Sequence, residues 1–232
     1  VGNDLVKPET SGLPSSENFQ FVTAAMDVAS CDVIILMLPN SKIVDDLLWN
    51  QGLAKAMKPG ACILDMSSSH PVNSRENEKR LKELGKKFVD APVSGGVKRA
   101  IDGSLAIMMG GEKSVVDEVE PILKALGKTL VYVGQAGAGH AVKALNNYVS
   151  AAGLLAAAEA LVAAQEFGID PHVVNQVFNA STGKNNTTEN KVEQFMLNEK
   201  YNSGFSLSLM RKDLETALSF MTSVGQDADF AK

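Results

Sequence analysis

The sequence predicts an α/β domain followed by an all-helical domain, and three observations support this fold class. As far as Gly134, short apolar runs rich in β-branched residues alternate with segments of helical periodicity, which is typical of βαβ units around a mainly parallel sheet. After Gly134, strand signals almost disappear. A helical segment of about 30 residues, roughly 45 Å long, begins there instead. We therefore place a first domain at residues 1–134 and a second domain at residues 135–232.

The apolar runs of the first domain define its expected strands. The run "DVIILML" is continuous and is closed by Pro39-Asn40, so we expect a strand buried on both faces of the sheet. Residues 1–18 are rich in Pro, Gly, Ser and Glu, and we expect them to be irregular. The expected strands are Phe19–Val22, Asp32–Leu38, Ala61–Met66, Phe88–Val93, Ser104–Met109 and Thr129–Val133.

Helix-ending residues mark the helices between these strands. Lys58-Pro59-Gly60 stops one helix and Gly85 lies just past the end of another, as proline and glycine commonly do. The expected helices of the first domain are Ile43–Met57, Pro71–Leu84 and Lys113–Leu126.

The second domain begins with a long, alanine-rich helix. Gly168 ends it, and Asp170-Pro171 then supplies an N-cap and a first-turn proline for the next helix. The apolar stretch 151–164 includes Glu159, and we interpret it as a buried helix rather than a membrane span. The expected helices are Ala138–Phe167, Pro171–Asn179, Glu189–Asn198 and Leu207–Val224.

Composition excludes several function classes. The 232 residues are 45% hydrophobic and carry a net charge of −5. Because no basic stripe is present, we expect no nucleic-acid partner. Cys31 and Cys62 lie in apolar segments without metal-ligand spacing, which favours buried, reduced thiols in a reducing compartment. The three histidines show no ligand spacing, and we assign them no role.

Small polar residues and glycines follow three of the predicted strands. In a parallel α/β sheet, ligands bind outside the carboxyl ends of the strands, and such residues offer free backbone N–H groups there. A plain tight turn is the alternative interpretation. The three segments are Leu38-Pro39-Asn40, Ser67-Ser68-Ser69 and Ser94-Gly95-Gly96.

A glycine-rich segment, "VGQAGAGHAVKALNNY", follows the last predicted strand and opens the long helix. Its glycines, Gly134, Gly137 and Gly139, have the spacing GxxGxG. Dinucleotide loops require GxGxxG, a pattern that occurs nowhere in the chain. We therefore reject a dinucleotide-binding loop at this segment.

Two charged positions stand out in the second domain. Lys143 and Asn147 are four residues apart and share one helix face, and the apolar neighbours of Lys143 would lower the pKa of its ammonium and suit it to proton transfer. A lysine that extends from a buried helix into solvent is the alternative. Lys212-Asp213 interrupts an apolar-periodic helix, either as a functional pair or as a solvated one.

Taken together, these segments resemble the β-hydroxyacid dehydrogenase family, which includes 3-hydroxyisobutyrate dehydrogenase. The resemblance covers about residues 20–224. It implies a Rossmann-like NAD- or NADP-binding domain, followed by an all-α domain with a long interdomain helix. The motifs that carry it are "DVIILMLPNS", "LDMSSSHP", "DAPVSGG", "DGSLAIMMGG", "GQAGAGHAVKALNN" and "MRKDLETA".

The resemblance also implies residue roles. Lys143 would be the catalytic acid/base. The substrate-binding residues would be Ser94, Gly95, Gly96, Asn147 and Lys212, and the cofactor-binding residues Leu38, Pro39, Ser68 and Lys212.

The implied reaction is NAD(P)-dependent oxidation of a small β-hydroxyacid, with 3-hydroxyisobutyrate to methylmalonate semialdehyde as the leading case. L-threonate, tartronate semialdehyde and succinic semialdehyde partners remain alternatives, and Ser181–Lys191 is expected to lie near the substrate and to set this choice. We expect a homodimer or homotetramer through the helical domain, no membrane partner, and a cytoplasmic location or the mitochondrial matrix. NAD and NADP both remain open.

The chain departs from the family at both ends. The family's opening strand–GxGxxG–helix unit and its last helices are absent, so we expect a fragment, an incomplete gene model or an ordered subset of a longer protein. A non-catalytic dimerisation module is therefore a second hypothesis.

Overall fold

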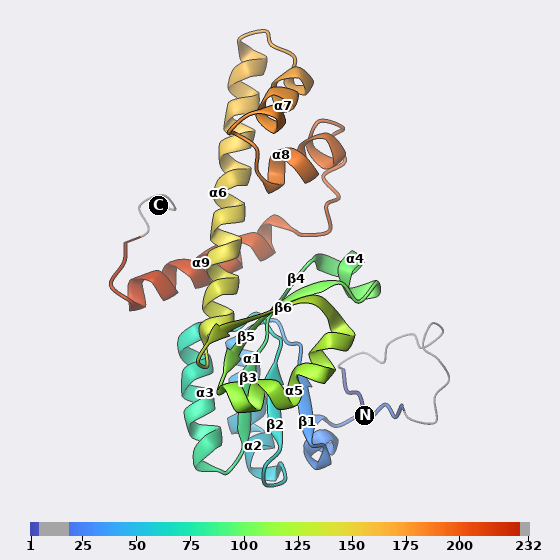
Figure 1. Cartoon of the computed structure of the whole chain (residues 1–232), viewed down its shortest axis with the longest axis vertical. Coiled ribbons are helices and arrows are strands. Elements are labelled where there is room, and N and C mark those ends of the chain that lie inside the picture. Colours follow the sequence, from blue (N-terminus) through green and yellow to red (C-terminus); the bar gives the residue numbers. More distant parts are fainter. Residues whose placement is uncertain (5–18, 228–232) are drawn as a thin grey trace. The chain divides into compact units, whose positions relative to one another are not determined.

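The computed structural model describes residues 1–4 and 19–227, and the chain divides into two compact units (Figure 1). Unit 1 comprises Val1–Gly95 and Arg99–His140, and unit 2 comprises Gly96–Lys98 and Ala141–Lys232. Most of the first eighteen residues, predicted to be irregular, lie outside the described part. The predicted strand Phe19–Val22 is reduced to an isolated parallel bridge between Gly2 and Phe21. The domain boundary predicted after Gly134 stays a prediction.

Unit 1 contains a six-stranded sheet with the order β1-β2-β3-β5-β4, in which β6 also pairs with β5. The pairs β1–β2, β2–β3 and β5–β6 are parallel, whereas β5 runs antiparallel to β3 and β4. The reversal has a local cause, because the link 95–104 is too short for the crossover of about a dozen residues that a parallel pair needs. The strands are β1 (Val33–Leu36), β2 (Cys62–Asp65), β3 (Lys87–Asp90), β4 (Val93–Ser94), β5 (Leu105–Gly111) and β6 (Gly127–Gly134).

Helices cover the sheet of unit 1. The predicted helix Ile43–Met57 is broken, because Gly52 has a φ of +86° and a left-handed residue cannot continue an α-helix. The helix α4 was not predicted, whereas the bounds predicted for α5 are confirmed. The helical elements are η1 (Ala25–Ser30), α1 (Ser41–Asp45), η2 (Asp46–Asn50), α2 (Leu53–Ala56), α3 (Pro71–Glu83), α4 (Gly96–Ile101) and α5 (Lys113–Leu126).

The core of unit 1 consists of two apolar clusters. Successive residues along a strand belong to different clusters. Ile63 and Phe88 pack with α1, α2 and α3. Leu64 and Val89, the next residues along the same strands, pack with α5. All four residues of β2 are buried, as expected for a strand covered on both faces of the sheet.

The first strand corrects the sequence interpretation. We expected "DVIILML" to be buried on both faces, but Ile35 is 43% exposed and Met37 is 58% exposed. Only β2 pairs with β1 in the described sheet, so β1 is an edge strand there and helices cover the face that carries Ile34 and Leu36.

Unit 2 is helical. The Asp170 carboxylate caps α7 by accepting the His172 N–H at 2.9 Å, as predicted. The predicted helix Glu189–Asn198 is interrupted at Lys191, whose φ of −126° is not helical. The elements are α6 (Ala138–Glu166), whose first turn belongs to unit 1, α7 (Pro171–Ala180), α8 (Asn186–Asn190), η3 (Val192–Met196) and α9 (Leu207–Ser223).

The long helix α6 is far less buried than we expected from its alanine-rich sequence. Only 17% of its most apolar window is buried, and the mean hydropathy of that window is 1.4. Within the described residues, α6 is the one helix whose length and composition would allow it to cross a membrane. The prediction of a buried helix is wrong for the described chain, because the elements that pack on α6 cover only part of its circumference.

Candidate active site

The carboxyl ends of β1 and β2 bring two predicted cofactor residues together. The Leu38 N–H donates to the Ser67 Oγ at 2.9 Å, and the Leu38 carbonyl accepts the Ser68 N–H at 3.3 Å. Pro39, the next residue, is exposed. The Ser68 hydroxyl makes no hydrogen bond to another described residue, so it is available to a ligand at this edge of the sheet.

The segment Ser94-Gly95-Gly96 combines a strand end with unusual backbone angles. Ser94 ends β4, and the φ values of Gly95 and Gly96 are +139° and +66°. Side chains rarely adopt such angles. A Cβ on Gly95 would also lie 2.5 Å from the Cδ of Arg99. The backbone conformation of the turn is therefore enough to account for glycine at both positions. The role of these glycines in substrate binding stays a prediction.

Three predicted site residues of unit 2, Lys143, Asn147 and Lys212, lie around Asp213, to which we had assigned no role. The Asn147 Nδ2 of α6 donates to the Asp213 Oδ2 of α9 at 2.6 Å. The Lys212 Nζ lies 3.1 Å from the Asp213 Oδ1. Asp213 is 9% exposed, so α6 and α9 hold a largely buried carboxylate against the face that carries Lys143.

The environment of Lys143 favours loss of its proton. Burial is the largest influence and lowers the pKa of the ammonium below its ordinary value of 10.5. The positive charge of Lys212 lowers this pKa as well, while the carboxylate of Asp213 raises it. A lysine with a lowered pKa exchanges protons more readily near neutral pH.

Sequence reasoning singled out the Lys212-Asp213 pair but gave a role only to the lysine. The contact between Asn147 and Asp213 joins residues that are 66 positions apart. The signal that could have found Asp213 is its position inside an otherwise apolar-periodic helix, where a buried carboxylate requires a partner.

A second group of buried polar residues lies in unit 1, and sequence reasoning did not connect its members. His140, to which we assigned no role, is 1% exposed. Its Nδ1 lies 2.8 Å from the Ser74 Oγ, and its Nε2 lies 3.0 Å from the Ser67 carbonyl oxygen. The Asp90 carboxylate accepts the backbone N–H groups of Gly137 and His140. These residues fix the start of α6 against the ends of β2 and β3.

The GxxGxG spacing before α6 has a packing explanation. A Cβ on Gly137 would lie 2.5 Å from the Pro71 carbonyl oxygen, and Gly137 has a φ of +83°. A Cβ on Gly139 would lie 2.4 Å from the Met108 carbonyl oxygen. Both positions therefore require glycine because α6 begins in direct contact with neighbouring backbone.

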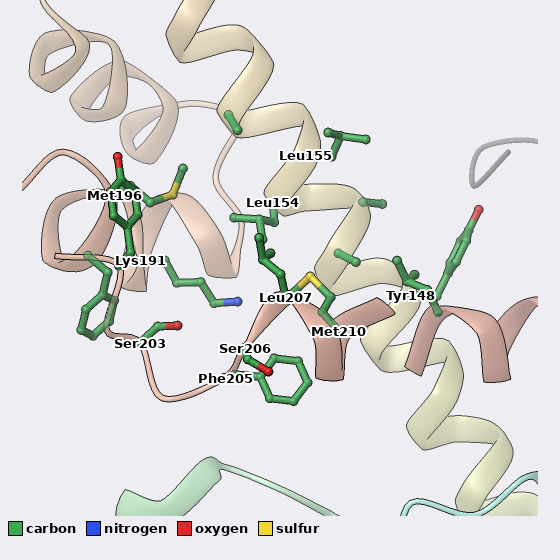
Figure 2. A pocket seen from close by; sticks show the side chains of 16 residues that line it. Tyr148, Leu154, Leu155, Lys191, Met196, Ser203, Phe205, Ser206, Leu207 and Met210 are labelled. Carbon is green, nitrogen blue, oxygen red and sulfur yellow. The ribbon is translucent and has the colours of Figure 1, made fainter. Parts of the chain in front are cut away.

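Unit 2 also contains an apolar cavity of about 790 Å³ between α6, η3 and α9 (Figure 2). Tyr148, the residue after Asn147, lines it, and the Lys191 side chain extends into it. Burial lowers the pKa of Lys191. Of the segment Ser181–Lys191, which we expected near the substrate, only Lys191 lines this cavity.

Two family models match the chain over nearly its whole length. One is described as the NAD binding domain of 6-phosphogluconate dehydrogenase and matches residues 3–134. The other is described as "NAD-binding of NADP-dependent 3-hydroxyisobutyrate dehydrogenase" and matches residues 137–232.

Individual relatives agree with these matches. The chain is 38% identical to 2-(hydroxymethyl)glutarate dehydrogenase of Eubacterium barkeri over 89% of its own length and 67% of the relative. It is 35% identical to mitochondrial 3-hydroxyisobutyrate dehydrogenase of Homo sapiens over 88% of its own length and 63% of that enzyme.

A solved structure of Mycobacterium tuberculosis 3-hydroxyisobutyrate dehydrogenase with L-serine is 32% identical and has a TM-score of 0.84, covering 91% of this chain and 74% of that one. The chain thus spans roughly two thirds to three quarters of the length of these three proteins. The domain matches, the sequence identity and the common fold agree, and the chain belongs to the NAD(P)-dependent β-hydroxyacid dehydrogenase family that includes 3-hydroxyisobutyrate dehydrogenase.

Proposed function

We propose that the protein oxidises a small β-hydroxyacid with NAD or NADP, and that its substrate is 3-hydroxyisobutyrate, which it converts to methylmalonate semialdehyde. The observation that carries the proposal is the group formed by Lys143, Asn147, Lys212 and Asp213. It provides an amine with a lowered pKa beside a fixed amide and a largely buried carboxylate.

Each residue of this group has a distinct task. In the oxidation, the neutral amine of Lys143 takes the proton of the substrate hydroxyl while the carbinol carbon loses its hydride and becomes a carbonyl carbon. The bound cofactor supplies the acceptor for that hydride. Asp213 orients the Asn147 amide through the 2.6 Å hydrogen bond, so that Asn147 is held in place to bind the substrate. We assign the substrate carboxylate to Ser94, Gly95 and Gly96.

The residues at the strand ends suit a dinucleotide. Leu38, Pro39 and Ser68 lie at the carboxyl ends of two adjacent parallel strands, which is where open α/β sheets bind nucleotides. The Ser68 hydroxyl has no partner among the described residues, so it would be free to bind a polar group of the cofactor. We also assign Lys212 to the cofactor, on the family resemblance alone.

The direct test is a comparison of substrates. The purified protein should reduce NAD or NADP in the presence of 3-hydroxyisobutyrate with a higher kcat/KM than with L-threonate, L-serine or 2-(hydroxymethyl)glutarate. The reverse reaction should be assayed with tartronate semialdehyde and succinic semialdehyde. A higher kcat/KM for one of these compounds would keep the reaction class and change the substrate. No turnover of any hydroxyacid would favour the non-catalytic alternative.

Asp213 provides a test that depends on pH. Because its carboxylate raises the pKa of Lys143, Asp213→Asn should lower that pKa further. Oxidation requires the neutral amine, so kcat/KM should rise with pH through the pKa of Lys143, and the variant should complete this rise at lower pH than the wild type. The pH dependence of kcat/KM measures the shift.

Glu215→Gln is the matched control, because Glu215 lies on the same helix and its exposed carboxylate pairs with Arg211. This variant should leave the pH profile unchanged. A rise that stays in place, or moves to higher pH, in Asp213→Asn would contradict the assignment of the profile to Lys143.

We also propose that a second copy of the chain covers the open side of α6. Apolar side chains recur on this side every three or four residues and are exposed or half-exposed, which is the spacing of one helix face. Small alanines dominate its second half and would let another helix approach closely. We call this surface the α6 stripe, and it consists of Val142, Leu145, Val149, Ala156, Ala160 and Ala163, with Ala152 at its edge beside the cavity.

Charging the α6 stripe should dissociate the oligomer. Val149 is 68% exposed, and Val149→Lys would place a charge at the centre of the contact. We expect the wild type to sediment as a dimer or tetramer and the variant as a monomer. Val177→Lys on α7, where Val177 is 56% exposed, should keep the wild-type mass. A monomeric wild type would contradict the proposal, and binding of the wild type to lipid vesicles would favour a membrane partner instead.

A further inference from the structure

We propose that Asp90 is a positioning residue for the reaction, and that it acts by anchoring the first turn of α6, the helix that carries Lys143. The inference rests on the proposed function for its effect on turnover. The anchoring itself can be measured separately.

The Asp90 carboxylate binds the start of α6 through two backbone groups. Its Oδ1 accepts the Gly137 N–H at 2.8 Å, and its Oδ2 accepts the His140 N–H at 2.9 Å. These N–H groups belong to the turn before α6 and to its first turn, where helix N–H groups lack partners within the helix. Asp90 is the last residue of β3 and is 0% exposed. A strand end therefore supplies the cap of α6.

Two glycines lie close to the carboxylate. A Cβ on Gly110 would lie 2.5 Å from the Asp90 Oδ1, and a Cβ on Gly139 would lie 2.8 Å from the Asp90 Oδ2. Both positions hold glycine. The strand β5 and the first turn of α6 thus lie close around the carboxylate.

His140 strengthens the same anchor from the helix side. Its ring contacts the Ser74 Oγ and the Ser67 carbonyl oxygen, and its Nδ1 lies 3.6 Å from the Asp90 Oδ2. The first turn of α6 is therefore held by its backbone to β3 and by one side chain to α3 and the end of β2.

Burial and the local hydrogen bonds act in opposite directions on the charge of the Asp90 carboxylate. Burial is the dominant influence and raises the pKa of Asp90, whereas the His140 ring and the two backbone N–H groups oppose that rise. A helix N-terminus also favours negative charge. An asparagine would avoid the cost of burying a charge but would have only one acceptor oxygen for the two N–H groups.

The consequence for catalysis follows from the helix. Lys143 lies three residues after His140 in continuous α-helix. Movement of the first turn would therefore also displace the backbone of Lys143. A proton transfer depends steeply on the distance and orientation of the groups. Loosening this anchor should therefore lower kcat more than it raises KM for either substrate.

Asp90→Asn is the test, because the amide keeps the shape of the side chain but has only one acceptor oxygen for two N–H groups. We expect amide hydrogen exchange at residues 137–143 to accelerate at least tenfold, and kcat to fall at least tenfold with each KM within threefold of the wild type. Asp170→Asn is the control, because the Asp170 carboxylate also accepts a backbone N–H at the start of a helix, α7. It should leave kcat and the exchange at 137–143 unchanged.

The two readouts separate the possible failures. Unchanged exchange at 137–143 in Asp90→Asn would overturn the anchoring, even if the protein had no dehydrogenase activity. Faster exchange with kcat within threefold of the wild type would overturn the positioning role. If Asp90→Asn does not fold, amide hydrogen exchange of the wild type still tests the anchoring. Unprotected amides at Gly137 and His140 would contradict the two hydrogen bonds.

Discussion

Replacing Lys143 with methionine should lower turnover by roughly 10²- to 10⁴-fold, the usual contribution of a general acid or base. Methionine fills a similar volume but has no proton to exchange. Lys143→Arg should be nearly as inactive, because its guanidinium keeps the charge and stays protonated at every accessible pH. Steady-state kinetics with the hydroxyacid and the cofactor varied in turn would measure the loss. Turnover within tenfold of the wild type in either variant would exclude Lys143 as the acid/base.

Lys143→Met should not destabilise the folded protein, and its effect on the free energy of unfolding should depend on pH. Burial lowers the pKa of Lys143 in the folded protein below the ordinary value of 10.5. Below the folded pKa, both folded and unfolded chains carry the charge, and the folded chain bears the cost of burying it. That cost disappears as pH rises through the folded pKa toward the unfolded one. The wild type should therefore gain stability over this range, whereas Lys143→Met should not.

Thermal unfolding measured at several pH values between neutral pH and the ordinary lysine pKa would check this relation. The Tm of Lys143→Met should equal or exceed that of the wild type at neutral pH. A Tm well below that of the wild type would show that Lys143 supports the fold, and a loss of turnover could then not be assigned to chemistry alone.

Gly139→Ala should cause a large loss of stability by adding a single methyl group at the start of α6. The added Cβ would lie 2.4 Å from the Met108 carbonyl oxygen and 2.8 Å from the Asp90 Oδ2. Neither group can move freely, because the first belongs to the strand β5 and the second belongs to a carboxylate whose two oxygens each accept a backbone N–H. Overpacking of this kind costs about 1–3 kcal/mol or more, and we expect the upper end of that range. Urea unfolding would measure the change in the free energy of unfolding.

Gly153→Ala is the matched control in the same helix. There the new Cβ would meet only the Asn185 side chain, at 3.4 Å. Alanine is favoured over glycine inside a helix by about 0.5–1 kcal/mol, so this variant should be neutral or slightly stabilised. A loss below about 1 kcal/mol in Gly139→Ala would indicate that the start of α6 yields more easily than overpacked sites usually do.

Local patterns determined most of the secondary structure. The bounds of α5 (Lys113–Leu126) were predicted without error, because its apolar periodicity is strong and strand residues flank it closely. The predicted start of α7 after Asp170 is confirmed, because a cap and a first-turn proline act within one helical turn. The errors arose where a single residue interrupted a longer helical pattern. Gly52, for example, breaks the predicted helix Ile43–Met57.

Family membership was also accessible from the sequence, because six short motifs follow one another in the family's order. The face shared by Lys143 and Asn147 follows from their spacing of four residues on a helix. These inferences need only the order of residues and the helical repeat. They do not require knowledge of which strand lies beside which.

Only the tertiary structure decided how those residues are held. Asp213 meets Asn147 across 66 positions, Asp90 meets His140 across 50, and His140 meets Ser67 across 73. Such contacts depend on the order of strands in the sheet and on the crossing of α6 with α9. A periodic pattern cannot encode them, because it reports which face of an element is apolar but not which distant element covers that face. The sequence by itself therefore determined the elements, the family and one helix face, whereas packing decided which buried carboxylates cap α6 and orient Asn147.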